Sequence, residues 1–263
     1  MNNINILKTL PINIDFYQYG ISNLHAWIRC MECILHISYR LEIKKWRIRN
    51  TDKVHYEERK KIIQKKLKEE LHILVDIPKP GSGTTNTGNM ARIFFQNYIT
   101  TANITGVNAD LIKRIGVILV ALSSYKQIDS VLFQQYAMAT FNLYLSEYNW
   151  FYMPSSLHKI LLHGADIMQS AGLPIGMFSE EAIEARNKDF RNIRRDHTRK
   201  FSRLETLTDL FQTLLYTSDI LISSISPDNR KICKTRSRFN IFEDEIQKLM
   251  LPEDLQDDDD DDT

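Results

Sequence analysis

Apolar residues recur every three or four positions along most of this 263-residue chain, and no segment alternates apolar and polar residues over a convincing length. The first such segment shows the pattern, with Leu24, Ile28 and Leu35 on one side. This is the period of an α-helix that buries one face, whereas a half-buried strand has a period of two. We therefore expect a mainly α fold. The pattern predicts helices over residues 24–46, 54–74, 89–98, 109–122, 130–146, 155–171, 180–200 and 203–223.

Composition excludes several classes of protein. Hydrophobic residues make up 43% of the chain and charged residues 25%, which is typical of a globular protein and not of a disordered or collagen-like one. Three cysteines are too few for a disulfide framework and fit a reducing compartment. The longest apolar run, at residues 116–122, is too short to cross a bilayer, so we expect no membrane partner.

The charge of the chain is divided unevenly. Residues 239–263 carry eleven Asp or Glu and one Lys, which leaves 33 bases and 22 acids in residues 1–238, a net charge of +11. A body this basic favours a polyanionic partner, most simply nucleic acid. We expect the terminal run at residues 257–262 to be solvated and disordered. It would serve either as a solubilising tail or as a shield over a basic groove.

The Gly-rich loop at residues 79–89 does not match a nucleotide site. Gly83 and Gly88 have the spacing of a phosphate-binding loop, but Asn89 and Met90 stand where that loop needs Lys and then Ser or Thr. We expect a structured loop whose Asn and Thr side chains cap the next helix. No small-molecule cofactor is expected.

Two pairs of residues could form a zinc centre. Cys30 and Cys33 have C-x-x-C spacing, and His158 and His163 lie five apart. Together they supply the ligands of a Cys2His2 site. The alternative is core packing, because Cys30 and Cys33 fall inside an amphipathic helical segment, where small thiols are commonly buried.

The segment from Ser179 to Arg203 is the most informative. Ser179 is a plausible helix N-cap. Glu184, Lys188, Arg191, Arg195 and Arg199 then follow at steps of four, three, four and four, on one face of a helix. One interpretation is a solvated basic stripe with a weak Glu184–Lys188 ion pair. The other is a carboxylate that holds a divalent cation beside a phosphodiester, with the cations neutralising backbone phosphates.

Five segments occur in an order that matches a known family. They are LHAWIR at residues 24–29, ERKK at 58–61, GNMAR at 88–92, HKILLH at 158–163 and GMFSEEAIEARNKDFR at 176–191. This combination resembles the C-terminal catalytic region of Transib transposases and of their relative, the catalytic subunit of the V(D)J recombinase. The similarity covers roughly residues 10–222.

The resemblance implies an RNase H-like core in which two Asp and one Glu bind two divalent ions, Mg²⁺ or Mn²⁺, for DNA nicking and strand transfer. Glu184 matches the third acid, and His158 and His163 match the family's two zinc-binding histidines. DNA is then the expected partner and the nucleus the expected location. The residues expected to contact DNA are Lys188, Arg191, Arg194, Arg195, Arg199 and His25.

The chain also departs from the family. The family's catalytic Asp residues and its zinc-binding C-x-x-C precede the LHAWIR segment, and this chain starts only 23 residues before Leu24. Cys30 and Cys33 follow that segment, so they are not the family's cysteines. We therefore expect a transposase fragment without the core strands, with incomplete zinc and divalent-ion sites, that binds DNA but does not cut it alone.

Three parts are predicted on this basis. They are a helical insertion domain with the zinc histidines (1–176), the third-acid helix with a C-terminal helical region (177–238), and an acidic disordered tail (239–263). Two alternatives stay open. One is a domesticated, non-enzymatic helical module that binds DNA or protein, and the other is a self-contained zinc-stapled helical protein. A homodimer is compatible with each.

Overall fold

The computed structural model describes residues 20–81, 83–218 and 240–251. These residues form helices and contain no β-strand, only isolated bridges between Pro78 and Thr84 and between Ile128 and Met250. The mainly α expectation is therefore confirmed. No helix in this part of the chain is long and apolar enough to span a membrane.

The chain divides into two compact units, with the boundary between Ser179 and Glu180. The larger unit comprises the described residues up to 179 and from 241 onward, and the helical hairpin comprises α9 and α10. The larger unit contains α2 (Asn23–Ser38), α3 (Lys53–Leu71), α4 (Gly88–Gln96), α5 (Tyr98–Thr105), α6 (Ala109–Ser123), α7 (Ser130–Tyr148), α8 (Ser155–Ala171) and α12 (Glu243–Gln247). The hairpin contains α9 (Glu181–Asp196) and α10 (Arg203–Ser218).

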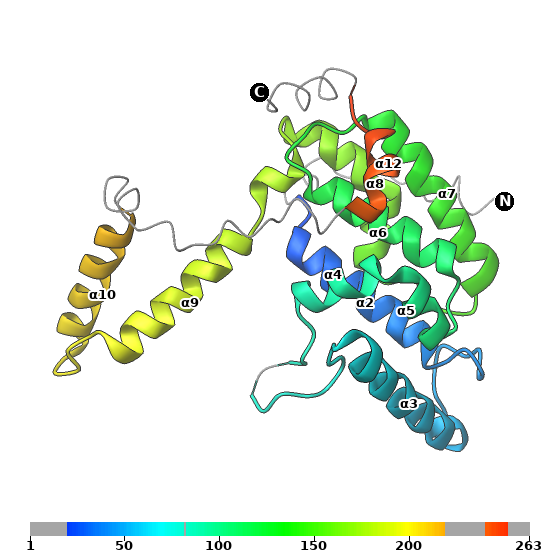
Figure 1. Ribbon diagram of the computed structural model, residues 1–263, viewed down its shortest axis with the longest axis horizontal. Helices are drawn as coiled ribbons and strands as arrows, with labels where there is room; N and C mark the ends of the chain where they lie inside the picture. Colours follow the sequence, from blue (N-terminus) through cyan, green and yellow to red (C-terminus); the bar gives the residue numbers. More distant parts are fainter. Residues whose placement is uncertain (1–19, 82, 219–239, 252–263) are drawn as a thin grey trace. The chain divides into compact units, whose positions relative to one another are not determined.

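Helix α2 forms the centre of the larger unit. It packs against α4, α6 and α8 (Figure 1). Most of its side chains are buried. Trp27 is fully buried, donates a hydrogen bond from Nε1 to Ser123 Oγ at 3.0 Å, and meets the Phe95 ring edge-on at 5.9 Å. Helix α6 is apolar on nearly every side, as expected of a helix surrounded by others. The core therefore lies where these two helices meet.

Several predicted helices have different bounds in the structure, and two of them show why. The helix predicted over 24–46 ends at Ser38, because burial ends with Tyr39 and residues 44–47 are all exposed, so further turns would have no core to contact. The helix predicted over 89–98 is interrupted at Asn97, where α4 ends and α5 begins. The Asn97 side chain donates from Nδ2 to the Ile93 carbonyl at 2.8 Å, a local bond that competes with helix continuation.

The predicted disordered tail is wrong for residues 240–251. A 3-10 turn (Asn240–Phe242) and α12 pack on α6 there. Phe242, Ile246 and Leu249 are buried, and Glu245 forms an ion pair with Lys113. Apolar residues four and three apart give this acidic segment one face that can be buried, and a count of charges does not detect such a face. The Asp run at 257–262 lies outside the described residues.

Candidate nucleic-acid interface

The helical hairpin carries most of the predicted DNA-contacting residues. Helices α9 and α10 pack against each other (Figure 1). Among the described side chains of these two helices, Ile193 and Leu210 are buried. Between Arg186 and Arg203 the sequence holds eight Lys or Arg and two Asp. The hairpin is therefore rich in cationic side chains. A cationic side chain that is already paired with a carboxylate is less able to bind an anion, so the contacts of each Lys and Arg matter.

Arg199 does not lie on the face of α9, contrary to the prediction. The helix ends at Asp196, so Arg199 falls in the turn that leads to α10. There its guanidinium binds the Asp209 carboxylate through Nε at 3.1 Å and a second nitrogen at 2.8 Å, and its backbone N–H donates to the same carboxylate at 2.7 Å. These bonds lower the pKa of Asp209. Arg199 therefore closes the hairpin.

Two arginines that do lie on α9 are also held by contacts within the hairpin. Arg195 makes paired hydrogen bonds to the adjacent Asp196, both at 2.9 Å, and these lower the pKa of that carboxyl group. Arg186, which the sequence analysis did not single out, donates to the Leu214 carbonyl at 3.1 Å and to Thr217 Oγ1 at 3.0 Å. It thus caps the C-terminal end of α10, where unpaired carbonyls attract a cation.

Lys188, Arg191 and Arg194 differ from Arg186, Arg195 and Arg199, the paired arginines of the hairpin. All three are exposed, and none forms an ion pair with a described residue. The spacing of three residues places Arg191 and Arg194 on neighbouring turns, with Lys188 one turn earlier. Together they are a row of cationic groups whose charges are not neutralised by described carboxylates.

Glu184, the predicted third acid, lies in the first turns of α9. Its side chain lies outside the described residues. Within the part of the chain that the structure describes, no three His, Cys, Asp or Glu side chains are grouped as a metal ion would need. The described residues therefore do not form the divalent-ion site that the resemblance implies.

The two predicted zinc histidines are brought together on α8. The rings of His158 and His163 lie 5.5 Å apart between centroids, although the residues are separated by more than a helical turn. Burial lowers the pKa of both imidazoles, and at His163 the Asp166 carboxylate opposes this shift. Both are therefore mainly neutral at pH 7, the form that binds zinc. They are two of the four ligands that a closed zinc site requires.

Cys30 and Cys33 do not join the histidines. Both are buried in the core along α2, and no group of four Cys and His ligands forms among the described residues. Burial raises the pKa of the Cys33 thiol to about 12, although its contact with the Tyr144 hydroxyl opposes the shift, and burial also raises that of Cys30. Zinc binds the thiolate, so these neutral thiols fit core packing better than metal binding.

The two buried thiols should not react in the folded protein. In a Cys233→Ser variant, which removes the cysteine outside the described residues, we expect Ellman's reagent to titrate no thiol at pH 8 and two after denaturation in guanidinium. The native measurement should be unchanged by EDTA, because desolvation and not a metal protects the thiols. Release of a reactive thiol by EDTA alone would contradict the core assignment.

His25 belongs to the larger unit, in the first turn of α2. It is exposed, its ring Nδ1 is 2.8 Å from Ser22 Oγ, and its backbone N–H donates to the same oxygen. These contacts form the N-cap of α2. A role of His25 in DNA contact stays a prediction, because these local contacts do not test it.

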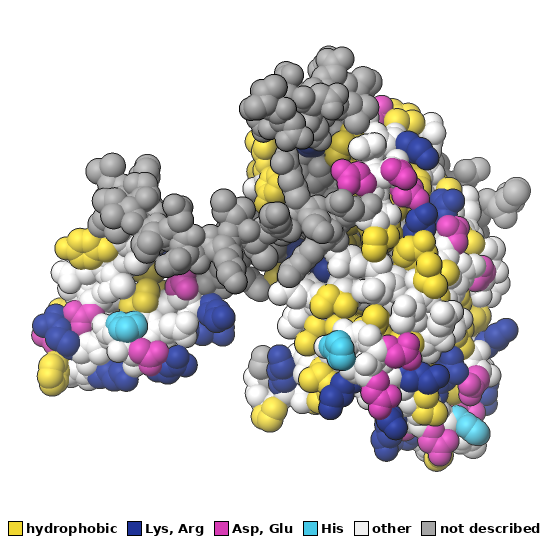
Figure 2. Space-filling view, in the orientation of Figure 1, with side chains coloured by type: hydrophobic (Ala, Val, Ile, Leu, Met, Phe, Trp, Pro, Cys, Tyr) yellow, Lys and Arg dark blue, Asp and Glu magenta, His cyan; other side chains and the backbone are white. Residues whose placement is uncertain are grey.

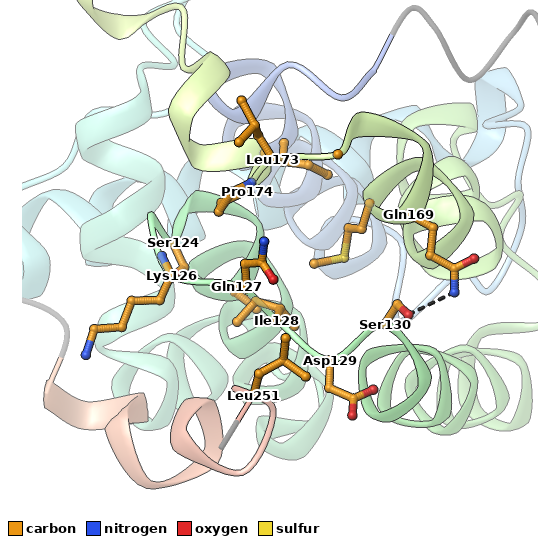
Figure 3. Close-up of a pocket in the computed structure, with 14 residues that line it drawn as sticks. Ser124, Lys126, Gln127, Ile128, Asp129, Ser130, Gln169, Leu173, Pro174 and Leu251 are labelled. Atoms are coloured by element: carbon orange, nitrogen blue, oxygen red, sulfur yellow. Dashed lines mark hydrogen bonds between the residues drawn. The ribbon is translucent and has the colours of Figure 1, made fainter. Parts of the chain in front are cut away.

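A pocket of about 330 Å³ lies between the end of α6, the start of α7, the end of α8 and Leu251 (Figure 3). Its walls mix apolar side chains with Lys126, Gln127 and Asp129. The Asp129 carboxylate is already the N-cap of α7, accepting hydrogen bonds from the backbone of Val131 and Leu132. The pocket therefore offers no cluster of ionisable groups suited to acid–base or metal chemistry.

No protein-family model matches this chain, and no curated protein matches it significantly.

Proposed function

We propose that this chain is a DNA-binding helical portion of a Transib-like transposase, and that it contacts duplex phosphates through Lys188, Arg191 and Arg194. The observation that carries the proposal is the absence of ion pairs between these three exposed side chains and described residues, beside arginines that are occupied within the hairpin. Phosphate contacts by such groups release counterions, which favours binding to any duplex.

The resemblance supports the choice of DNA as the partner, because the segment with these cations matches the family's third-acid helix. It assigns only Glu184 of the three catalytic acids to this chain. Two-metal catalysis needs carboxylates that hold both ions, so the proposal contains binding and no cleavage step. His158 and His163 would contribute two ligands to the zinc site of a complete assembly.

The test is fluorescence anisotropy with a labelled 20-base-pair duplex at 50 to 200 mM KCl. The variant Lys188→Gln, Arg191→Gln, Arg194→Gln should bind roughly 10- to 100-fold more weakly at the lowest salt. The slope of log K against log salt should fall by about 3, because each lost phosphate contact contributes about 0.9. Far-UV circular dichroism checks that α9 remains helical.

A control variant removes the same charge from elsewhere. Lys79, Arg114 and Lys248 lie outside the hairpin, and their replacement by Gln should leave the affinity within about twofold. Equal losses in both triple variants would contradict a specific α9 surface. Mg²⁺-dependent cleavage of the duplex that disappears in Glu184→Ala would contradict the inactive fragment.

A further inference from the structure

A second cationic surface lies on the larger unit, where the chain passes from α2 to α3. Residues 44–68 contain eleven Lys or Arg and three Asp or Glu. Figure 2 shows Lys and Arg side chains gathered over α3 and the chain beside it, with acidic groups among them. Lys44, Arg47 and Arg49 are exposed and form no ion pair with a described residue, whereas Lys45 binds Asp52 at 3.1 Å. This end of the unit therefore offers phosphate-binding groups.

Aromatic side chains lie within the same surface. Trp46 meets the edge of the Phe151 ring at 5.1 Å and lies 5.4 Å from the Tyr152 ring, between centroids. Phe151 is buried, and the Arg40 guanidinium lies 5.6 Å from its ring centroid. The turn after α7 therefore supports Trp46 from beneath and holds it beside Tyr152.

Both supported rings remain accessible to solvent. Trp46 is 46% exposed and Tyr152 is 64% exposed. Large aromatic side chains are normally buried, so two neighbouring exposed rings on an ordered support indicate a binding surface. The backbone fixes this arrangement as well, because Lys44 adopts a positive φ of 50° and its N–H donates to the Arg40 carbonyl at 2.8 Å.

We propose that Trp46 and Tyr152, flanked by Lys44, Arg47 and Arg49, bind single-stranded nucleic acid. Exposed rings beside phosphate-binding cations are the combination that single strands use, since each unpaired base has a face that stacks on an aromatic ring. A duplex covers its base faces by internal stacking, and an acidic peptide has no bases. The chemistry of this surface thus favours a single strand over either alternative.

This inference does not depend on the proposed role of α9, because the two surfaces belong to different units and fit different forms of nucleic acid. The probes are a labelled 20-nucleotide oligothymidylate and an abasic strand of the same length, which keeps the phosphates and lacks the bases. Binding to the full chain is measured by anisotropy. The wild type should bind oligothymidylate at least 10-fold more tightly than the abasic strand.

The variant Trp46→Ala, Tyr152→Ala should lose at least 10-fold in affinity for oligothymidylate and little for the abasic strand, because stacking is removed and charge is not. The control variant Tyr125→Ala, Phe201→Ala removes two exposed aromatic residues elsewhere and should change neither affinity. Replacing Lys44, Arg47 and Arg49 by Gln should weaken both probes and lower the salt slope by about 2.

A fluorescence measurement keeps the test valid if the double variant folds poorly. Oligothymidylate should quench tryptophan emission in a Trp150→Phe variant, which removes the partly buried tryptophan next to Phe151. Adding Trp46→Phe to that variant should abolish most of this quenching, because the remaining tryptophan, Trp27, is fully buried. Equal affinity for the two probes, or unchanged quenching when Trp46→Phe is added, would overturn the proposal. Equally tight binding of polyglutamate would assign the surface to acidic peptides and overturn it too.

The α9 variant separates the two proposals. Replacement of Lys188, Arg191 and Arg194 should leave oligothymidylate affinity within about twofold while duplex affinity falls. Loss of single-strand binding in that variant, with no effect of Trp46 and Tyr152, would place the single strand on α9 and refute the second surface.

Discussion

Trp27→Ala should lower the free energy of unfolding of the larger unit by about 4 kcal/mol, since truncation of a fully buried aromatic side chain costs about 3 to 5 kcal/mol. The indole has no exposed surface, contacts Phe95 and donates a hydrogen bond to Ser123. Its removal leaves a cavity between α2, α4 and α6 and leaves the Ser123 hydroxyl without this donor. Urea denaturation followed by far-UV circular dichroism measures the loss.

Two controls separate packing from other effects of removing a tryptophan. Trp46→Ala should cost less than about 1 kcal/mol, because the ring of Trp46 is nearly half exposed. Trp27→Phe keeps most of the buried ring and loses the indole N–H, so its cost should fall between the two. A Trp27→Ala variant as stable as Trp46→Ala would show that α2 is not the centre of this core.

Gly176→Ala should destabilise the larger unit by about 3 kcal/mol, at the upper end of what overpacking of a core costs. Gly176 lies in the 3-10 turn Ile175–Phe178, and a Cβ there would collide with the Ser124 carbonyl oxygen and come within 2.6 Å of the Ser123 carbonyl oxygen. These are backbone atoms at the end of α6, which cannot rotate away as a side chain can. A thermal melt should show a midpoint lower by about 2 to 4 °C per kcal/mol.

Gly172→Ala provides the comparison. A Cβ at Gly172 meets no atom within 4 Å, but the residue has a φ of +67°, so the cost is about 1 kcal/mol of backbone strain. The two glycines are four residues apart. Gly176→Ala measures the cost of a steric clash, and Gly172→Ala measures the cost of a left-handed backbone conformation. Equal melting temperatures would indicate that the turn before α9 can move away from α6, contrary to the buried position of Gly176.

Several helices could be predicted closely because their local signals and their burial agree. The helix predicted over 155–171 has these bounds in α8, which begins after Pro154 and ends at Gly172 in the left-handed conformation. Proline favours the start of a helix because its φ is fixed and it has no N–H to pair, and glycine favours the end because it adopts a positive φ without strain. The helix ends at Ser38 and before Asn97 were not predicted, because the apolar period of the sequence continues across both positions. The helices are interrupted there only in the packed structure.

The predicted row of cations on α9 contains both paired and unpaired residues, and helical spacing does not distinguish them. Lys188, Arg191 and Arg195 have the positions that the sequence indicated on α9, yet Arg195 is held by its neighbour Asp196. Arg199 binds Asp209, ten residues later. To predict this pair one would have to know the turn between α9 and α10. A search for acids within one loop length of each arginine would have identified this pair as a candidate.

The sequence by itself determined that the chain is helical, where most helices lie, and that a net positive body carries a row of cations near residue 190, because these properties depend on near neighbours along the chain. Tertiary structure alone decided that Arg199 binds Asp209, that Cys30 and Cys33 stay in the core, and that Phe242 packs on α6. Those outcomes depend on distances between residues far apart in sequence, which burial of apolar surface sets when the helices pack.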